Sequence, residues 1–302
     1  MADKEITLLI SSGKNDVAQQ RQVICRNTWL KYIDLNKFNY YFFSNSPDES
    51  QTEEFAVNED NLWIKTLELE KTEILYTSVK NKTGFYERGV TPFQDHCFEG
   101  FPIKDSETQE IIGVENLIGE KFYTKNFGFW DEPDGSRHYV WKNLTNLRMK
   151  AFEFALNNHD SDYFAIIDDD AYVIADYINK FDFSGFDRLS TDGLIGPEEN
   201  KYPAGFFYVL SRKAVEAILN YKEYDTFFHP NSPYDDLGFN HVLLNTFPDL
   251  KEKRLNGIFD IPLSQDMDYL YSVMLNCMCL HPFKTKEAML EIHKKYLEKL
   301  TS

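Results

Sequence analysis

The sequence has few cysteines, and their number and spacing argue against the two usual structural roles of this residue. Four occur among 302 residues, at positions 25, 97, 277 and 279. A scaffold held by disulfide bonds needs more of them in a shorter chain. Cys277 and Cys279 lack the second pair that a structural zinc site requires. We therefore interpret the four thiols as ordinary buried or half-buried groups that suit a reducing compartment.

Basic residues are also scarce. The chain carries 32 Lys and Arg against 49 Asp and Glu, which gives a formal net charge of -17 at pH 7. A protein that binds the phosphate backbone of nucleic acids normally presents a basic face, so nucleic acid is not an expected partner, and neither is an anionic lipid surface. A small anionic ligand such as a nucleoside diphosphate is compatible with this charge if a metal ion or local cationic side chains offset it.

No apolar run is long enough to span a bilayer, which takes about 18 residues or more. The N-terminal stretch MADKEITLLISSG also lacks the apolar region of a signal peptide. We therefore expect a cytoplasmic protein without membrane insertion. The Golgi lumen is the alternative if the chain is a piece of a longer, anchored protein.

The pattern of apolar residues predicts alternating strands and helices. Strands are expected at residues 6–11, 38–43, 62–67, 163–167 and 206–210. Helices are expected at residues 16–33, 141–157, 212–221, 235–247 and 285–300. This alternation is typical of a mostly parallel sheet with helices on both faces. Without a repeat or a low-complexity linker, we predict one domain over residues 1–302, with an irregular insertion or lid at about residues 81–137.

Three adjacent aspartates follow the strand expected at residues 163–167. Asp168, Asp169 and Asp170 repel one another at a buried strand end unless a cation is bound there. Alternate residues of an extended chain point to the same side, so Asp168 and Asp170 can converge while Asp169 points away. Ligands of open parallel sheets bind beyond the carboxyl ends of the strands, and paired carboxylates suit Mg2+ or Mn2+. The alternative is that the run merely caps the next helix.

Three further segments accompany the aspartates in a characteristic order. They are RQVICRNTW at 21–29, YPAGFFYVLSR at 202–212 and SPYDDLG at 232–238. Together with the aspartates and with CLHPFK at 279–284, they resemble the fringe-like and core-1-type β1,3-glycosyltransferases. The resemblance covers roughly residues 6–284, apart from the middle of the chain. It implies the GT-A fold, a Rossmann-like α/β domain that binds a nucleotide-sugar through a divalent metal ion.

The resemblance also implies roles for individual residues. Asp168 and Asp170 are the expected metal-side carboxylates, and His281 is expected as a third ligand in its neutral form. The ion, Mn2+ or Mg2+, stabilises charge on a diphosphate leaving group. An inverting transfer also needs a base beside the acceptor hydroxyl. The family has it in an acidic pair, here Asp235 and Asp236, of which we favour Asp236, although the pair can instead simply cap the helix that follows.

The remaining predicted contacts concern the nucleotide-sugar donor. Ser11 and Ser12 end the first strand and are placed to meet the nucleotide base or ribose. One of Arg21 and Arg26 is expected to reach the diphosphate or uracil while the other pairs structurally. Gly205 has no Cβ and permits a close approach of backbone to the sugar or the acceptor. The full set of predicted donor-binding residues is Ser11, Ser12, Arg21, Arg26, Arg148, Asp169, Gly205 and Lys284.

One segment departs from the family pattern. The family often carries N-L-T-x-K before the aspartates, whereas NLTNLRMK at 143–150 has Leu147 at the Lys position and Arg148 next to it. Donor contacts of that Lys are therefore lost or pass to Arg148. This leaves the donor sugar open among galactose, N-acetylglucosamine, glucose and xylose. The acidic segment also departs, because Asp235 and Asp236 stand one residue closer to the following glycine than in the family.

The leading hypothesis is a metal-dependent inverting glycosyltransferase, a hexosyl- or pentosyltransferase that uses a UDP-sugar. Its acceptor is expected to be a glycan or glycoprotein, selected by residues 81–137. A metal-dependent phosphohydrolase or nucleotidyltransferase is the second hypothesis. It calls for a glycine-rich phosphate loop, and neither GxxxxGK followed by Ser or Thr nor GxGxxG occurs. The third is a non-catalytic glycan-binding descendant of the fold, which would more often have lost the acidic and His positions.

Overall fold

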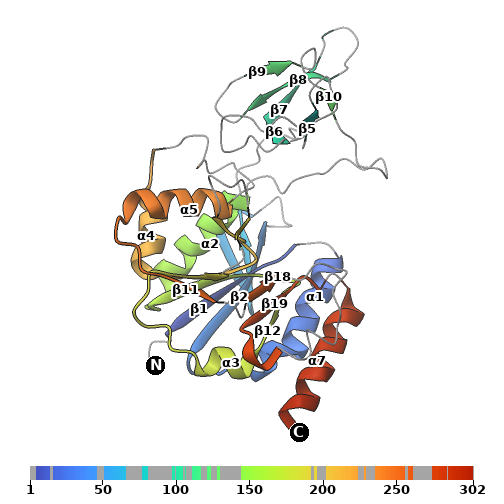
Figure 1. Ribbon diagram of the computed structural model, residues 1–302, viewed down its shortest axis with the longest axis vertical. Coiled ribbons are helices and arrows are strands. Elements are labelled where there is room, and N and C mark those ends of the chain that lie inside the picture. Colours follow the sequence, from blue (N-terminus) through green and yellow to red (C-terminus); the bar gives the residue numbers. More distant parts are fainter. Residues whose placement is uncertain are drawn as a thin grey trace.

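The computed structural model is that of an α/β protein, and it describes most of the residues. The described residues are 5–13, 16–45, 51–65, 77–80, 97–98, 100–104, 106, 111–116, 121–123, 128–129, 144–191, 194–195, 202–223, 228, 235–255, 258–260, 274–283 and 285–301. Figure 1 shows a central sheet flanked by helices, and a set of short strands from the middle of the sequence to one side.

The first strand lies at the centre of the sheet. β1 (Ile6–Ser11) is a run of buried apolar residues, as a strand covered on both faces must be. It pairs in parallel with β2 (Phe38–Asn45) and with β11 (Tyr163–Asp168), and Ser11 lies opposite Asp168 in the register. The chain therefore turns from one half of the sheet to the other between β1 and β11, where ligands of such sheets bind.

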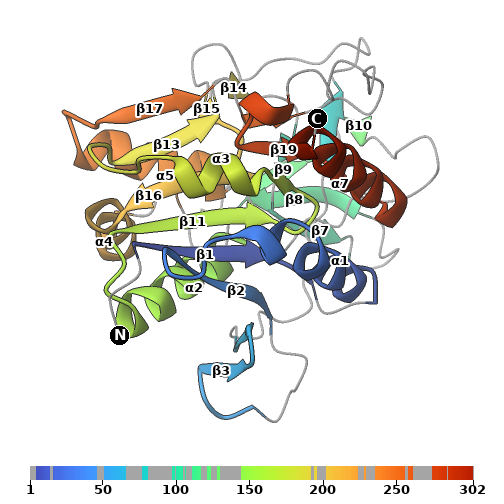
Figure 2. The ribbon, with the colours of Figure 1, turned by 90° about the horizontal axis from the view of Figure 1, so that it is seen from below.

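The main sheet has eight strands in the order β17-β13-β16-β11-β1-β2-β4-β3. The outer strands are β3 (Phe55–Asn58), β4 (Asn61–Ile64), β13 (Arg188–Thr191), β16 (Phe207–Ser211) and β17 (Glu252–Leu255). Within the described part of the chain, β16 and β3 run antiparallel to their neighbours and the other six strands share one direction. Figure 2 shows the succession from β17 to β2 across the sheet.

Helices cover both faces of this sheet. One face carries α1 (Asp16–Asn27), α3 (Ala175–Lys180) and α7 (Lys286–Thr301), and the other carries α2 (Leu144–Asn158), α4 (Arg212–Asn220) and α5 (Asp235–Thr246) (Figure 1). Side chains of β1 alternate between the two layers: Leu8 and Ile10 pack in the core beneath α1, whereas Leu9 packs in the core beneath α2. The predicted fold class, an α/β domain with a mostly parallel sheet and helices on both faces, is confirmed.

A small second sheet brings a late segment of the chain to the carboxyl end of β11. Its order is β12-β19-β18, from β12 (Tyr172–Val173), β19 (Cys279–His281) and β18 (Ile258–Asp260). Backbone bonds extend the connection, because Ile174 N–H donates to Met278 O at 2.9 Å and Phe283 N–H donates to Asp170 O at 2.7 Å. His281 thereby lies beside the aspartates.

The predicted helix at residues 16–33 is wrong in its second half. α1 ends at Asn27, and residues Trp29–Tyr32 form a separate 3-10 turn. The Thr28 backbone is non-helical, with φ of -112° and ψ of -109°, and its hydroxyl donates to Ile24 O at 2.7 Å. A side chain that bonds the backbone in this way competes with continuation of the helix.

The middle of the chain contributes two further small sheets. β5 (Thr77–Lys80), β6 (Cys97–Phe98) and β10 (Gly128–Phe129) form one, and β7 (Gly100–Lys104), β8 (Ile111–Asn116) and β9 (Lys121–Tyr123) form the other. The rest of the predicted insertion at 81–137 lies outside the described residues, and the single domain over 1–302 stays a prediction. Among the described helices, none combines the length and the apolar composition needed to cross a bilayer.

Candidate active site

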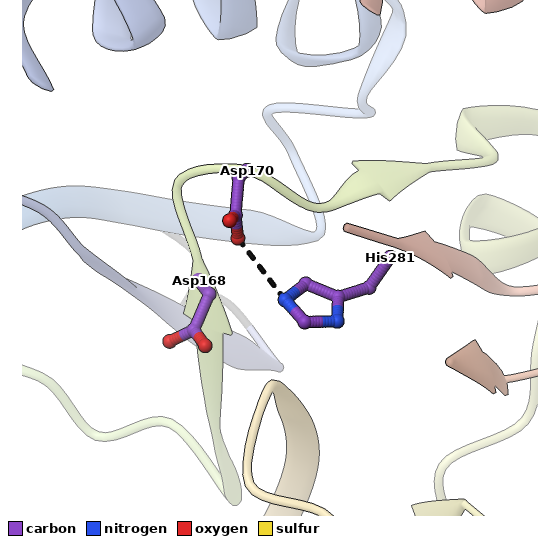
Figure 3. Close-up of side chains that lie close together, drawn as sticks. All are labelled: Asp168, Asp170 and His281. Atoms are coloured by element: carbon purple, nitrogen blue, oxygen red, sulfur yellow. Dashed lines mark ion pairs between the residues drawn. The ribbon is translucent and has the colours of Figure 1, made fainter. Parts of the chain in front are cut away.

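The three residues predicted as metal ligands lie together at the carboxyl edge of the main sheet. Asp168 ends β11, Asp170 lies in the turn that follows, and His281 ends β19. Their ligand atoms all lie within 4.8 Å of one another, and His281 Nε2 is 3.1 Å from Asp170 Oδ1 (Figure 3). Asp170 is buried, whereas the Asp168 side chain is 31% exposed and faces the outside of the cluster.

This geometry fits a divalent cation. Two adjacent ligands of an octahedral ion at about 2.1 Å are about 3.0 Å apart, and opposite ones are about 4.2 Å apart. The 3.1 Å between His281 and Asp170 matches an adjacent pair. Two carboxylates and one neutral imidazole suit Mn2+ or Mg2+, and they leave coordination positions for oxygen atoms of a ligand. The cluster can therefore hold a metal.

Asp169 points away from this cluster, although it lies with Asp170 in the turn after β11 and not in an extended strand. Its carboxylate accepts hydrogen bonds from the Ser12 hydroxyl at 2.8 Å and from Arg21 Nη1 at 3.2 Å. Ser12 in turn accepts a bond from the Gln22 amide at 3.1 Å. Burial raises the pKa of Asp169 to about 6, against the opposing effect of Ser12 and Arg21. The predicted donor residues Ser12, Arg21 and Asp169 are thus brought together between β1, β11 and α1.

Arg26 lies in a separate, structural pair. Its Nε and Nη2 donate to the two carboxylate oxygens of Asp60 at 2.7 and 2.6 Å, and its guanidinium lies 4.5 Å above the Phe42 ring. This two-bond geometry holds α1 against the edge between β2 and β4. Of the two arginines predicted near the donor, Arg26 therefore takes the structural role, and Arg21 lies nearer the aspartates.

Arg148 is a buried cation that connects the metal cluster with the second acidic pair. The residue is 3% exposed, and its guanidinium donates to Asp235 Oδ2 at 2.6 Å, to Asp168 Oδ1 at 2.8 Å and to Gly205 O at 3.1 Å. Burial acts to lower the pKa of Arg148, but the two carboxylates outweigh it and hold the pKa above its ordinary value. Arg148 thus bonds three protein groups, and its predicted contact with the donor stays a prediction.

The structure distinguishes the two acids at the start of α5. Asp235 is 2% exposed and is bonded by Arg148 and by the Tyr208 hydroxyl at 3.0 Å. Asp236 is half-buried and accepts a bond from its neighbour, Leu237 N–H, at 2.8 Å. Burial and the charge of Asp235 raise the pKa of Asp236 to about 7. Asp236 therefore has the properties of a base that works near neutral pH.

Gly205 makes room for Asp236. A Cβ on this glycine would lie 2.9 Å from Asp236 Cβ and 3.0 Å from its Oδ2, which is closer than side-chain carbons tolerate. The close approach predicted at Gly205 thus involves the candidate base. A pocket with a cavity volume of about 20 Å3, enough for about one water molecule, lies beside Asp236 and is also lined by Arg188 and Asn240.

Two findings complete the placement of the predicted residues. Ser11 lies at the end of β1, where its carbonyl accepts a bond from Asp169 N–H at 3.0 Å. Lys284 lies outside the described residues.

Sequence reasoning missed Phe206, whose ring stacks on the His281 imidazole with centroids 4.4 Å apart and planes 5° apart. The aromatic residue next to Gly205, just before a strand, was the available signal.

No family model matches the sequence, and no curated protein matches it. A solved structure that it resembles is a glycosyltransferase involved in the glycosylation of the major capsid of PBCV-1, with 11% identity, a TM-score of 0.42, and coverage of 97% of this chain and 98% of that chain. Another is the apo form of the glycosyltransferase GlyE of Streptococcus pneumoniae TIGR4, with 10% identity, a TM-score of 0.38, and coverage of 99% of this chain and 63% of that chain.

A second structure of GlyE from the same organism has 11% identity and a TM-score of 0.36, and the match covers 99% of this chain and 64% of that chain. This chain therefore spans somewhat less than two thirds of the GlyE chains. All three TM-scores lie below 0.5, so these likenesses do not show the function of this chain.

Proposed function

We propose that this protein is a metal-dependent inverting glycosyltransferase of the GT-A type. It transfers a hexose or pentose from a UDP-sugar to a hydroxyl of a glycan or glycoprotein. The observation that carries the proposal is the connection of a cation-binding cluster, Asp168, Asp170 and His281, to a carboxylate poised near neutral pH, Asp236. Arg148 forms that connection, with one bond to Asp168 and another to Asp235 beside the base.

The cluster serves the leaving group. A bound Mn2+ or Mg2+ supplies positive charge that stabilises a departing diphosphate. Asp168, Asp170 and His281 would hold the ion, and Arg148 bonds Asp168 Oδ1 beside them. The net charge of the chain is strongly negative, so this local positive charge is needed before an anionic donor can bind.

Asp236 serves the acceptor. In an inverting transfer the acceptor oxygen attacks the anomeric carbon of the sugar, and the bond from that carbon to the diphosphate breaks with its electron pair. The proton of the hydroxyl passes to the Asp236 carboxylate as the oxygen attacks. A pKa of about 7 gives a base strong enough to accept this proton and still largely ionised above neutral pH. Asp235, fixed by Arg148 and Tyr208, holds the start of α5 in place.

The donor nucleotide is proposed to lie over the ends of β1 and β11. Ser11 and Ser12 end β1, and the Arg21 side chain, 23% exposed, offers a guanidinium beside them. The bond from Arg21 to Asp169 orients that guanidinium. A nucleoside diphosphate at this edge meets hydroxyl and guanidinium donors together with the cation, as an anionic ligand requires.

Calorimetric titration with UDP tests the proposal, with Mn2+ present and then with EDTA. Wild-type protein is expected to bind UDP only with Mn2+, and Asp170→Ala is expected to lose that binding. Asp176→Ala is the matched control, since Asp176 is an exposed acid paired with Lys180 on α3. A screen of UDP-sugars for slow hydrolysis then identifies the sugar. Failure to bind UDP under either condition refutes the uridine donor, and release of phosphate from UDP-sugars or UDP supports the phosphohydrolase alternative.

A further inference from the structure

Phe206 touches two of the three residues of the cation-binding cluster. Its ring lies face to face with the His281 imidazole, with centroids 4.4 Å apart and planes 5° apart. Its carbonyl oxygen accepts a bond from Asp168 N–H at 2.9 Å. The side chain is 4% exposed, so the surrounding core fixes the ring. One residue thus contacts the ligand at the end of β11 by its backbone and the ligand at the end of β19 by its side chain.

We infer that Phe206 is a positioning residue of the metal site, which raises the affinity for a divalent cation by holding the His281 imidazole in its binding orientation. The inference rests on the proposed metal site and adds a residue outside the ligand set. A near-parallel stack fixes the plane of the imidazole, and that plane directs Nε2 toward Asp170 at 3.1 Å. Without the ring, the imidazole is free to turn about its side-chain bonds, and that freedom must be lost when the ion binds.

The electrostatics of the stacked rings also raise the affinity for the cation. The face of an aromatic ring carries negative potential. An imidazole bound to a divalent ion takes on part of the positive charge of that ion, so the bound form is attracted to the ring more strongly than the free neutral form. Replacing residues that orient a metal-binding His typically weakens metal affinity by about 10–100-fold. Loss of the Phe206 ring is expected to fall at the lower end of this range, because the stack contributes no hydrogen bond.

Gly205, the residue before Phe206, contacts the candidate base Asp236. Gly205 accepts a bond from Arg148 and lies in contact with the Asp236 side chain. Gly205 and Phe206 together therefore contact the candidate base, the buried cation and two metal-site residues. This two-residue segment therefore lies against both the candidate base and the residues that would hold the ion.

Titration of the nucleotide-free protein with Mn2+ tests the inference, with free Mn2+ followed by electron paramagnetic resonance and heat followed by calorimetry. Phe206→Leu is expected to bind Mn2+ about 10-fold more weakly than wild type, and Phe206→Tyr, which keeps the ring, to bind it within about 2-fold. Phe183→Leu is the matched control. Phe183 is a fully buried ring that packs against Phe38 and Phe181, so its loss lowers stability without a change in Mn2+ affinity.

A second comparison shows whether Phe206 acts through His281. In a His281→Ala background, Phe206→Leu is expected to change Mn2+ affinity by less than about 2-fold, because the stacked partner is gone. If Phe206→Leu does not fold, Phe206→Met keeps a similar volume without the ring and takes its place. Wild-type affinity in the ring-free variant overturns the inference, and so does an equal loss in both backgrounds. Absence of Mn2+ binding by the wild type overturns the proposed metal site as well, which separates the two failures.

Discussion

Replacing Arg148 by Met isolates the buried cation between the two acidic groups. Met has a comparable length and no charge, so the change removes three bonds with little change in packing. The bonds are those to Asp235 at 2.6 Å, to Asp168 at 2.8 Å and to Gly205 O at 3.1 Å. Of the two carboxylates, Asp235 is 2% exposed and is left without its cation in the interior, whereas the Asp168 side chain is 31% exposed and regains solvent.

The expected loss of stability follows from that difference. Removing one partner of a buried ion pair costs about 3–5 kcal/mol, since the other charge stays buried without compensation. The Asp168 pair adds at most about 1 kcal/mol, because solvent screens a partly exposed carboxylate. The unpaired Gly205 carbonyl adds about 1 kcal/mol. We expect Arg148→Met to lower the free energy of unfolding by about 4–7 kcal/mol, a large share of the roughly 5–15 kcal/mol of a typical domain.

Urea denaturation followed by circular dichroism measures this loss. Adding Asp235→Asn to Arg148→Met removes the stranded charge and is expected to restore about 2 kcal/mol, because the Asn side chain still bonds Tyr208. Arg254→Met is the matched control, since Arg254 is 42% exposed and pairs with Glu252 near the surface, where such pairs contribute less than about 1 kcal/mol. A loss below about 1 kcal/mol for Arg148→Met, or further destabilisation by the second change, would refute the reasoning.

Four further outcomes follow from the site. Gly205→Ala places a Cβ 2.9 Å from Asp236 Cβ and so shifts the base. The rate of sugar transfer at saturating donor is expected to fall about 10–100-fold, with UDP binding retained. An unchanged rate would mean that Asp236 is not the base. The transfer rate is expected to rise with pH and to level off above about 7, because burial first and the Asp235 charge second raise the pKa of Asp236 to about 7. A carboxyl group whose pKa is raised by folding stabilises the fold at low pH, and this contribution is lost as pH rises from about 4 to about 7. In EDTA, the stability of Asp236→Asn relative to wild type should therefore increase over this window. A constant difference between the two in urea titrations would contradict this. Ser12→Ala removes the hydroxyl bonded to Asp169 at 2.8 Å and should cost about 1–3 kcal/mol by urea denaturation, whereas no loss would show that the bond is dispensable.

The parts of the fold that sequence predicts are those with a strong local pattern. β1, β2 and β11 are continuous apolar runs, and α2 carries an apolar face in which Leu147 and Ala151 are buried. The missed strands β13 (RLST) and β17 (EKRL) are short and mostly polar. β13 is nevertheless fully buried between two other strands, whereas β17 is an outer strand whose residues are half-buried or exposed. Their pairing is decided by distant partners, which no local period records.

The same distinction applies to the site. Strand alternation predicts that Asp168 and Asp170 share a side, and the structure has them together with His281. The partners of Asp169 and Arg148 come from other elements, so whether each arginine meets a ligand or an internal acid depends on packing that the sequence pattern does not contain. Phe206 was passed over for that reason, since the aromatic residue beside Gly205 is visible in the sequence but its stacking partner, His281, lies in a distant segment.

The cation-binding cluster is completed only by a late segment of the chain, because His281 lies on the small sheet. A nascent chain that has emerged as far as β12 holds Asp168 and Asp170, and His281 takes its place beside them only when β19 docks beside β12. Until then the two aspartates form an open acidic edge with weak hold on any ion. Mn2+ affinity therefore reports whether β19 has docked beside β12.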